Sequence, residues 1–305
     1  MEDKCIGSVD KLRVVVLIEN SPAYDTYLEG CFGLSLWLEL WTGETCRRVL
    51  FDVGPLADSL FRNAEKLGVN LDSVDAIVLS HCHFDHTAAL AGVLKKLARP
   101  VPVFGHTDIF RPNFVLRPEF MDYSMCGENS RTNLENNGAV LILSKSPVEP
   151  FPGLMLTGEV EHTTDFEESG GVSCLTVDPA GEVVPDRLQD DVSVLINVRG
   201  LGLIVLSGCG HAGIVNIVKQ AKKVSGGADI TAVIGGFHLL QAPGERTEQT
   251  IQALTALAPG MSLIAPMHCT GLKPSARMAE AYGDAFRELH AGDAVTFTAT
   301  SSGGC

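Results

Sequence analysis

The chain has 305 residues, 45% of them hydrophobic, and a formal net charge of −14 at pH 7. This length and apolar content suit one large domain, which we expect to span residues 1–305. The acidic balance argues against a nucleic-acid-binding surface. No apolar run is long enough to cross a membrane, and the first residues are acidic where a secretory signal would be basic. Nine cysteines without regular spacing favour free thiols. We therefore expect a cytoplasmic protein with no membrane partner.

The first half of the chain alternates strand-like and helical patterns. In chain order we predict a strand at 34–40, an apolar strand within 48–54, a helix at 57–67 closed by Gly68, a strand at 76–80, a helix at 87–97 and a strand at 101–104. The second half repeats this alternation. There we predict strands at 139–143, 154–157, 171–177, 192–197 and 202–206, followed by a helix at 214–223.

The regular pattern breaks down between about residues 106 and 137. This segment combines prolines and polar residues with scattered aromatic side chains, among them Phe110, Phe114 and Phe120. An irregular insertion of this length is often functional, and we interpret it as a lid over a pocket or as the contact surface of a homodimer. The alternative is an ordinary packed surface segment.

The most informative motif is His81-Cys82-His83-Phe84-Asp85-His86, directly after the predicted strand at 76–80. Imidazole and carboxylate groups are preferred ligands of zinc, iron and manganese. In an extended segment alternate side chains share a face, so His81, His83 and Asp85 can point into one cavity while His86 enters from the next turn. The motif therefore predicts metal binding, with room for two neighbouring ions.

Three later histidines also follow apolar strands. Cys209 and His211 lie in the glycine-rich turn after the strand at 202–206, at the start of a helix, and His268 follows an apolar run. We expect His268 to be a metal ligand. In the glycine-rich turn there are two alternatives: Cys209 is a thiolate ligand, or His211 is the ligand with Cys209 packed beneath it, and we favour His211. His238 follows two glycines, which indicates close approach of the backbone to a ligand. We assign His238 to substrate binding or proton transfer.

The spacing His81-x-His83-x-Asp85-His86 resembles the signature of the metallo-β-lactamase superfamily. That resemblance implies an α/β fold, a four-layer αββα sandwich with metals at one sheet edge. It also implies that Asp52 orients a metal-bound histidine without binding metal itself. In the superfamily a carboxylate that bridges two metals occupies the position of Cys209. His162 lies where many members carry another metal-binding histidine, and it is a weaker candidate ligand.

The motifs at 207–213, 234–239 and 267–271 are similar to those of the dihydropterin ribofuranosylaminobenzene phosphate synthase-like branch. Membership implies transfer between a dihydropterin methyl diphosphate and a phosphorylated ribofuranosylaminobenzene in methanopterin assembly. This chain departs from the branch near His162, where a basic phosphate-binding position is replaced. We expect Arg111, Arg117 and Arg131 to substitute for it in binding an anionic small molecule.

The expected cofactors are two divalent metal ions, zinc first, with iron, manganese or magnesium as alternatives. The alternative activity is hydrolysis of an ester, amide or phosphoester, in which Asp85 accepts a proton from water. Two further alternatives are a di-iron redox protein and a metal-stabilised binding protein without turnover. The expected catalytic residues are Asp85 and His238.

Overall fold

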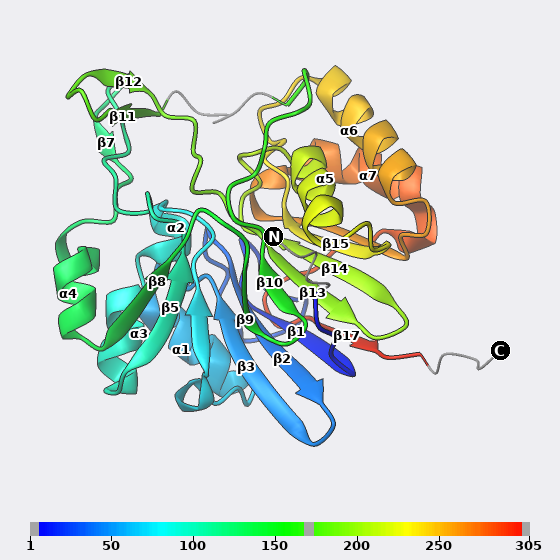
Figure 1. The fold of residues 1–305 in the computed structure, drawn as a ribbon, viewed down its shortest axis with the longest axis horizontal. Helices are drawn as coiled ribbons and strands as arrows, with labels where there is room; N and C mark the ends of the chain where they lie inside the picture. The colour runs from blue at the N-terminus through cyan, green and yellow to red at the C-terminus, as the bar shows by residue number, and fades with distance from the viewer. Residues whose placement is uncertain (1–5, 168–173, 301–305) are drawn as a thin grey trace.

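The computed structural model describes residues 6–167 and 174–300, whose strands form three sheets (Figure 1). The first sheet has the order β17-β1-β2-β3-β4-β5-β8 and contains β1 (Lys11–Ile18), β2 (Ser35–Thr42), β3 (Thr45–Phe51), β4 (Ala76–Val78), β5 (Val101–Gly105), β8 (Ala139–Leu143) and β17 (Ala294–Thr298). The second has the order β16-β15-β14-β13-β10-β9 and contains β9 (Val148–Phe151), β10 (Leu154–Leu156), β13 (Val194–Val198), β14 (Gly202–Ser207), β15 (Ile230–Gly236) and β16 (Leu263–Met267). The smaller third sheet has the order β12-β11-β6-β7 and contains β6 (Phe114–Val115), β7 (Met121–Asp122), β11 (Leu175–Val177) and β12 (Val183–Pro185).

Helices cover the outer faces of the two large sheets. The helices are α1 (Ala57–Lys66), α2 (Phe84–Thr87), α3 (Leu90–Leu97), α4 (Arg131–Asn136), α5 (Ile214–Val224), α6 (Gly244–Leu257) and α7 (Leu272–Tyr282). Short 3-10 turns are η1 (Leu71–Ser73), η2 (Gly127–Asn129), η3 (His268–Thr270) and η4 (Gly283–Ala285). In Figure 1, α1, α3 and α4 lie beside the first sheet, and α5, α6 and α7 lie on the far side of the second.

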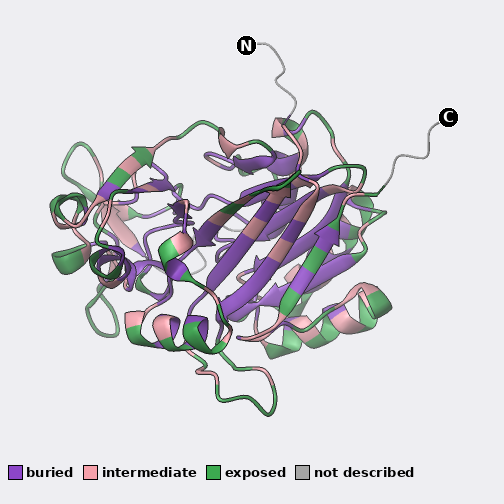
Figure 2. Ribbon diagram, turned by 90° about the horizontal axis from the view of Figure 1, so that it is seen from below, coloured by how far each residue is buried: buried purple, intermediate pink, exposed green. Residues whose placement is uncertain are grey.

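The alternation of side chains along the strands builds this layered structure. On β1, Val14 and Val16 face the core between the two sheets, where they join Ile204 and Leu206 of β14. The intervening Val15 belongs to the core beneath α1 and α3. Because successive side chains of a strand point to opposite faces, a strand buried on both sides becomes apolar throughout. Figure 2 shows the result, with buried strands inside and exposed helix faces outside.

Parallel strands bring the loops with unusual polar residues to one edge of the sandwich. Strands β3 and β4 are parallel in the first sheet, and β14, β15 and β16 are parallel in the second. Parallel strands need crossover connections, and α5 and α6 supply them in the second sheet. The segments that follow these five strands therefore begin at the same edge of the sandwich, where the carboxyl ends of the strands lie.

The four-layer αββα architecture predicted from the sequence is confirmed. Two local predictions are wrong. The predicted helix at 87–97 is interrupted, because the Ala89 amide donates to Gly54 while the Asp85 carbonyl accepts from Leu34, so the helix restarts at α3. The strand predicted at 171–177 partly falls outside the described residues, and its described part, β11, joins the third sheet instead of the sandwich because its side chains lack a core-facing apolar pattern.

The insertion at 106–137 supplies β6, β7, η2 and α4. Strands β6 and β7 pair with each other, and β6 pairs with β11 of the β11–β12 hairpin. This third sheet projects away from the sandwich at the upper left of Figure 1. Phe120 is 67% exposed there, with its ring centroid 6.3 Å from that of Phe114. The role of the insertion as a lid or homodimer contact stays a prediction. Within residues 6–167 and 174–300, no helix combines the length and the apolar character of a membrane span.

Candidate metal centre

The segment after β4 carries four buried metal-binding side chains. His81, His83, Asp85 and His86 are each no more than 7% exposed. The chain does not stay extended through Asp85, as the sequence analysis expected, but turns into α2 directly after His83. This turn places His86 within a ring-centroid distance of 4.4 Å from His81.

Loops of the second sheet face this segment. Cys209 and His211 follow β14, and His268 follows β16. All three are buried. The His211 ring centroid lies 4.8 Å from that of His81, and the His268 centroid lies 5.0 Å from that of His86. Residues more than a hundred positions apart thus meet where the two sheets adjoin.

The donor atoms form two groups that share one residue. Asp85, His86, Cys209 and His268 make the first group, and His81, Cys209 and His211 make the second. Within each group the donor atoms lie within 4.8 Å of one another. In the first, the His268 Nε2 atom is 3.1 Å from Asp85 Oδ2 and 3.3 Å from His86 Nε2. His83 lies beside the second group, with its ring centroid 4.6 Å from that of His81 and 4.8 Å from that of His211.

These residues fit divalent metal ions. The Nε2 atom of His81 and both ring nitrogens of His211 are buried without a hydrogen-bond partner. A buried polar atom without a partner carries a desolvation cost that a bound ion removes. Burial lowers the pKa values of His81 and His211 well below the usual range, and it lowers that of His83 to about 4. The neutral imidazoles can therefore offer lone pairs to a metal.

Asp52 orients two of the histidines. Its Oδ2 atom accepts hydrogen bonds from His86 Nδ1 and Ser80 Oγ, both at 2.7 Å, and its Oδ1 accepts from the Ser80 amide at 2.7 Å. Because the Ser80 hydroxyl donates to Asp52, the His81 Nδ1–H can donate to that hydroxyl at 2.9 Å. The rings of His86 and His81 then direct their Nε2 atoms toward the donor groups. Asp52 thus orients metal-binding histidines without binding metal itself.

The two carboxylates around His86 favour positive charge at this point. Burial opposes protonation of that ring, but Asp85 and Asp52 outweigh it and raise the pKa of His86 to about 9. Conversely, although burial works against ionisation, His86 and His268 hold the pKa of Asp85 well below its ordinary value. A cluster that stabilises both a carboxylate and a cation is electrostatically suited to a divalent ion.

Glu19 and Asn20, just after β1, hold His268, and neither residue was predicted from the sequence. The His268 amide donates to Glu19 Oε1 at 2.9 Å. Asn20 donates from Nδ2 to the His268 carbonyl at 2.9 Å, so its Oδ1 is left to accept from His268 Nδ1 at 3.0 Å. Their position at the end of an apolar strand, the same signal that revealed the other sites, could have identified them.

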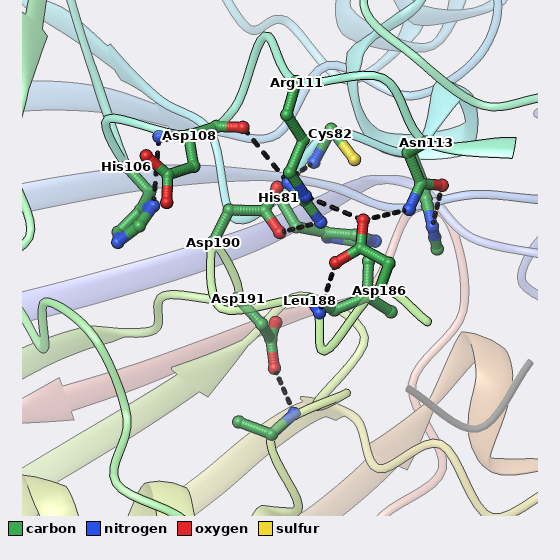
Figure 3. A network of polar contacts seen from close by, with 12 residues as sticks. His81, Cys82, His106, Asp108, Arg111, Asn113, Asp186, Leu188, Asp190 and Asp191 are labelled. Carbon is green, nitrogen blue, oxygen red and sulfur yellow. Dashed lines mark hydrogen bonds and ion pairs between the residues drawn. The ribbon is translucent and has the colours of Figure 1, made fainter. Parts of the chain in front are cut away.

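Asn113 plays the corresponding part for His83. Its Nδ2 donates to Asp186 Oδ2 at 2.7 Å (Figure 3). This bond leaves Oδ1 facing His83 Nε2 at 3.2 Å. No local sequence pattern marks this residue, because its partners come from distant segments. The third sheet therefore contacts the metal centre through a buried amide.

The binding of an anionic substrate by Arg111 stays a prediction, and the structure shows this side chain engaged by two carboxylates. Its guanidinium forms ion pairs of 2.7 Å with Asp186 and Asp190 (Figure 3). Asp190 also accepts a hydrogen bond from the Cys82 amide at 2.8 Å. These paired charges raise the pKa of Arg111 against the effect of burial. Arg111 thus neutralises two buried carboxylates that support the metal-binding segment.

The remaining weak candidates also lie away from the donor groups. Arg131 is exposed, pairs with Glu135 at 3.8 Å and lies over the Phe110 ring. Arg117 and His162 are exposed as well. His162 belongs to neither donor group, so the structure does not place it among the ligands proposed from the sequence. The amide of the next residue, Thr163, donates to Asn216 Oδ1 of α5 at 3.0 Å.

A cavity of about 250 Å³ opens onto the donor groups. It is lined by aromatic and apolar side chains together with members of the cluster: Phe32, His83, Phe84, Asp85, Met121, Tyr123, Cys174, Cys209, His211, His238, His268 and Cys269. His238 stands beside the cluster, with its ring centroid 4.2 Å from that of His211. Its φ of +47° is unusual for a side chain other than glycine and directs attention to a functional role.

We predict that Asp52→Asn weakens zinc binding about 10- to 100-fold, because an amide cannot accept the three hydrogen bonds that orient His86 and Ser80. Competition with a chromophoric chelator measures the affinity. Glu44→Gln, an exposed carboxyl-to-amide change in the β2–β3 turn, is the matched control. Equal affinities of Asp52→Asn and the parent protein would contradict the orienting role.

Replacement of Arg111 by Leu should destabilise the protein by about 3 kcal/mol, because it leaves Asp186 and Asp190 as unpaired buried charges. Denaturant unfolding at neutral pH measures this change. The exposed Arg117→Leu variant should stay within about 0.5 kcal/mol of the parent. If Arg111→Leu kept full stability and changed only the KM of an anionic substrate, the structural role assigned here would be incorrect.

Comparison with known proteins agrees with this geometry. The chain matches the model of the metallo-beta-lactamase superfamily over residues 44–219. It is 36% identical to the 7,8-dihydropterin-6-methyl-4-(beta-D-ribofuranosyl)-aminobenzene-5'-phosphate synthase of Methanocaldococcus jannaschii, in an alignment that covers 96% of this chain and 99% of the relative.

Two solved structures have a similar fold. Tm1679, a metal-dependent hydrolase of the beta-lactamase superfamily, gives a TM-score of 0.74 at 22% identity and covers 94% of this chain and 99% of its own. Zn(2+)-bound PqqB from Methylobacterium extorquens gives a TM-score of 0.52 at 13% identity, with 93% and 99% covered. At these identities the likeness concerns the fold alone. The family match and the full-length similarity to the synthase show that this chain is an enzyme of the metallo-beta-lactamase superfamily.

Proposed function

We propose that this enzyme joins a dihydropterin that carries a methyl diphosphate to a ribofuranosylaminobenzene 5'-phosphate, with two divalent ions, zinc preferred, in its centre. The proposal takes its substrate class from the synthase of Methanocaldococcus jannaschii, to which the chain is similar along nearly its whole length. The observation that carries it is the composition of the cavity.

The cavity combines a floor of metal-binding groups with aromatic walls. Phe84 and Tyr123 are stacked, with ring centroids 5.9 Å apart and planes inclined by 14°, and Phe32 lies 4.9 Å from the His268 ring. Among the described residues that line the cavity there is no Lys or Arg. A substrate with flat rings can stack on these walls, while its diphosphate must be bound by cations other than side chains.

The donor set indicates how ions would be held. Asp85, His86 and His268 would hold one ion, and His81 and His211 the other, with His83 beside them. Cys209 belongs to both groups. Mixed nitrogen, oxygen and sulfur donors suit zinc, with iron as the alternative. When bound, such ions neutralise the charge that develops on a departing diphosphate.

In the proposed transfer, the amine nitrogen of the aminobenzene forms a bond to the pterin methylene carbon. The bond between that carbon and the diphosphate oxygen breaks, and the amine loses a proton. His238 lines the cavity beside His211 and is the proposed proton acceptor. The aromatic walls hold the two rings in a fixed orientation, which lowers the entropic cost of bringing the reacting atoms together.

Hydrolysis is the alternative outcome at the same site. Water would then replace the amine, and Asp85, which also lines the cavity, would accept its proton. The apolar side chains of Phe32, Phe84 and Met121 favour transfer, because they leave few hydrogen-bond partners for an ordered water near the reacting carbon.

The first test is metal content and turnover of the parent protein and of a His83→Ala, His268→Ala double variant. We expect about two ions per chain in the parent, and loss of both metal and product in the variant. The first donor group loses its ligand His268, and the second loses the adjacent His83. His162→Ala is the matched control and should keep metal and turnover. Full product formation by protein cleared of metal would contradict the proposal, and release of a free pterin alcohol without coupling would favour hydrolysis.

The aromatic walls give a second prediction. Tyr123→Ala should raise the KM of the pterin substrate about tenfold, equivalent to roughly 1.4 kcal/mol, because a stacking surface is lost. Tyr123→Phe keeps the ring and should retain the parent KM. Steady-state kinetics at constant metal loading measure the difference. If both variants behaved alike, the ring of Tyr123 would have no part in substrate binding.

A further inference from the structure

The sulfur of Cys209 lies where the two donor groups meet. Over residues 6–167 and 174–300, Cys209 is the one residue that belongs to both donor groups. Its Sγ atom lies 3.2 Å from His86 Nε2, and the residue is 3% exposed. We propose that the Cys209 thiolate is a ligand shared by two metal ions. This inference rests on the binuclear centre of the proposed function and specifies the ligand that joins its two halves.

The turn that carries Cys209 is packed so closely that little else can enter. A side chain at Gly208 would collide with the Ser80 hydroxyl and come within 3.2 Å of Asp52 Oδ2. Gly210 has a φ of +74°, and a Cβ atom there would come within 2.7 Å of the Gly236 carbonyl. The backbone is thus held between the first metal-binding segment and the end of β15. Glycines on both sides leave the Cys209 side chain to fill the space between the donor groups.

Neighbouring thiols differ from Cys209 in their surroundings. Cys269 is also buried and lines the same cavity, but its thiol donates to the Cys209 carbonyl at 3.1 Å. Cys82 lies within the metal-binding motif itself, yet its side chain belongs to the apolar core beneath α1 and α3. Neither Cys82 nor Cys269 is part of a donor group. Cys82 and Cys269 are thus also buried near the centre. What distinguishes Cys209 from them is its position between the two donor groups.

A shared thiolate has chemical consequences that a carboxylate does not. Sulfur is a soft donor, so it favours zinc or iron over magnesium or manganese. It also contributes one negative charge to both ions, in a centre where Asp85 is the one carboxylate among the described donor groups. The centre should accordingly discriminate against hard ions more strongly than one joined by an oxygen ligand.

X-ray absorption at the zinc edge of the parent protein tests the inference without any substitution. With two zinc ions per chain, a shared thiolate gives each zinc a sulfur neighbour at about 2.3 Å. A thiolate bound to one ion gives on average half a sulfur per zinc, and an unbound thiol gives none. Two zinc ions with either lower value would overturn the shared ligand while the binuclear centre remained. Absence of metal would instead overturn the proposed function.

Cobalt-loaded variants supply an independent readout. The parent should show near-ultraviolet thiolate-to-cobalt charge-transfer absorption, and Cys209→Ser should lose it. Cys209→Asp should lose the absorption yet keep two ions per chain, because a carboxylate can also join two metals. Cys269→Ala, the matched control, should retain both the absorption and the metal content. Persistence of the absorption in Cys209→Ser and Cys209→Asp, or its loss in Cys269→Ala alone, would contradict the assignment. Should Cys209→Ser fail to fold, Cys209→Asp and the parent spectrum still show whether Cys209 is a ligand, and the zinc-edge measurement shows whether two ions share it.

Discussion

The buried carboxylate of Asp52 is the constraint on which the centre depends. It lies at the end of β3 with no solvent exposure, and such a charge is costly to bury unless every lone pair finds a donor. Ser80 and His86 supply those donors, and the Gly208 backbone fits against the same carboxylate from the second sheet. The interaction that satisfies Asp52 therefore also fixes the ring of His86 and the place where the two sheets meet.

The candidate metal ligands could be predicted from the sequence because they follow apolar strands. The motif from His81 to His86 and the later His268 were recognised in this way, and parallel strands brought their loops to one edge. The ion pairs of Arg111 could not be predicted from the sequence, because Asp186 and Asp190 lie on a segment more than seventy residues away and no periodicity reports such a pairing. The break before α3 was missed for the same reason, since it depends on hydrogen bonds to Gly54 and Leu34.

Buried polar contacts at its base attach the third sheet to the metal centre. Arg111 and Asn113 precede β6, and both contact Asp186, which follows β12. Breaking this junction would leave charged groups buried without partners, at a cost of several kcal/mol. Any closing motion is therefore restricted to the outer part of the sheet, around the exposed Phe120. The base of the sheet acts as a fixed wall that holds His83 through Asn113.

Charge distribution connects these features to catalysis. The chain carries a net charge of −14, and the described lining of the cavity includes no Lys or Arg, so long-range attraction cannot concentrate an anionic substrate there. In the proposed function, affinity for a diphosphate would depend on ions held by the donor groups, and affinity for the rings on Phe84 and Tyr123. Charge recognition would then be provided by the ions, and shape recognition by the aromatic and apolar walls. In such a site the partition between transfer and hydrolysis depends on how completely the acceptor ring fills the cavity.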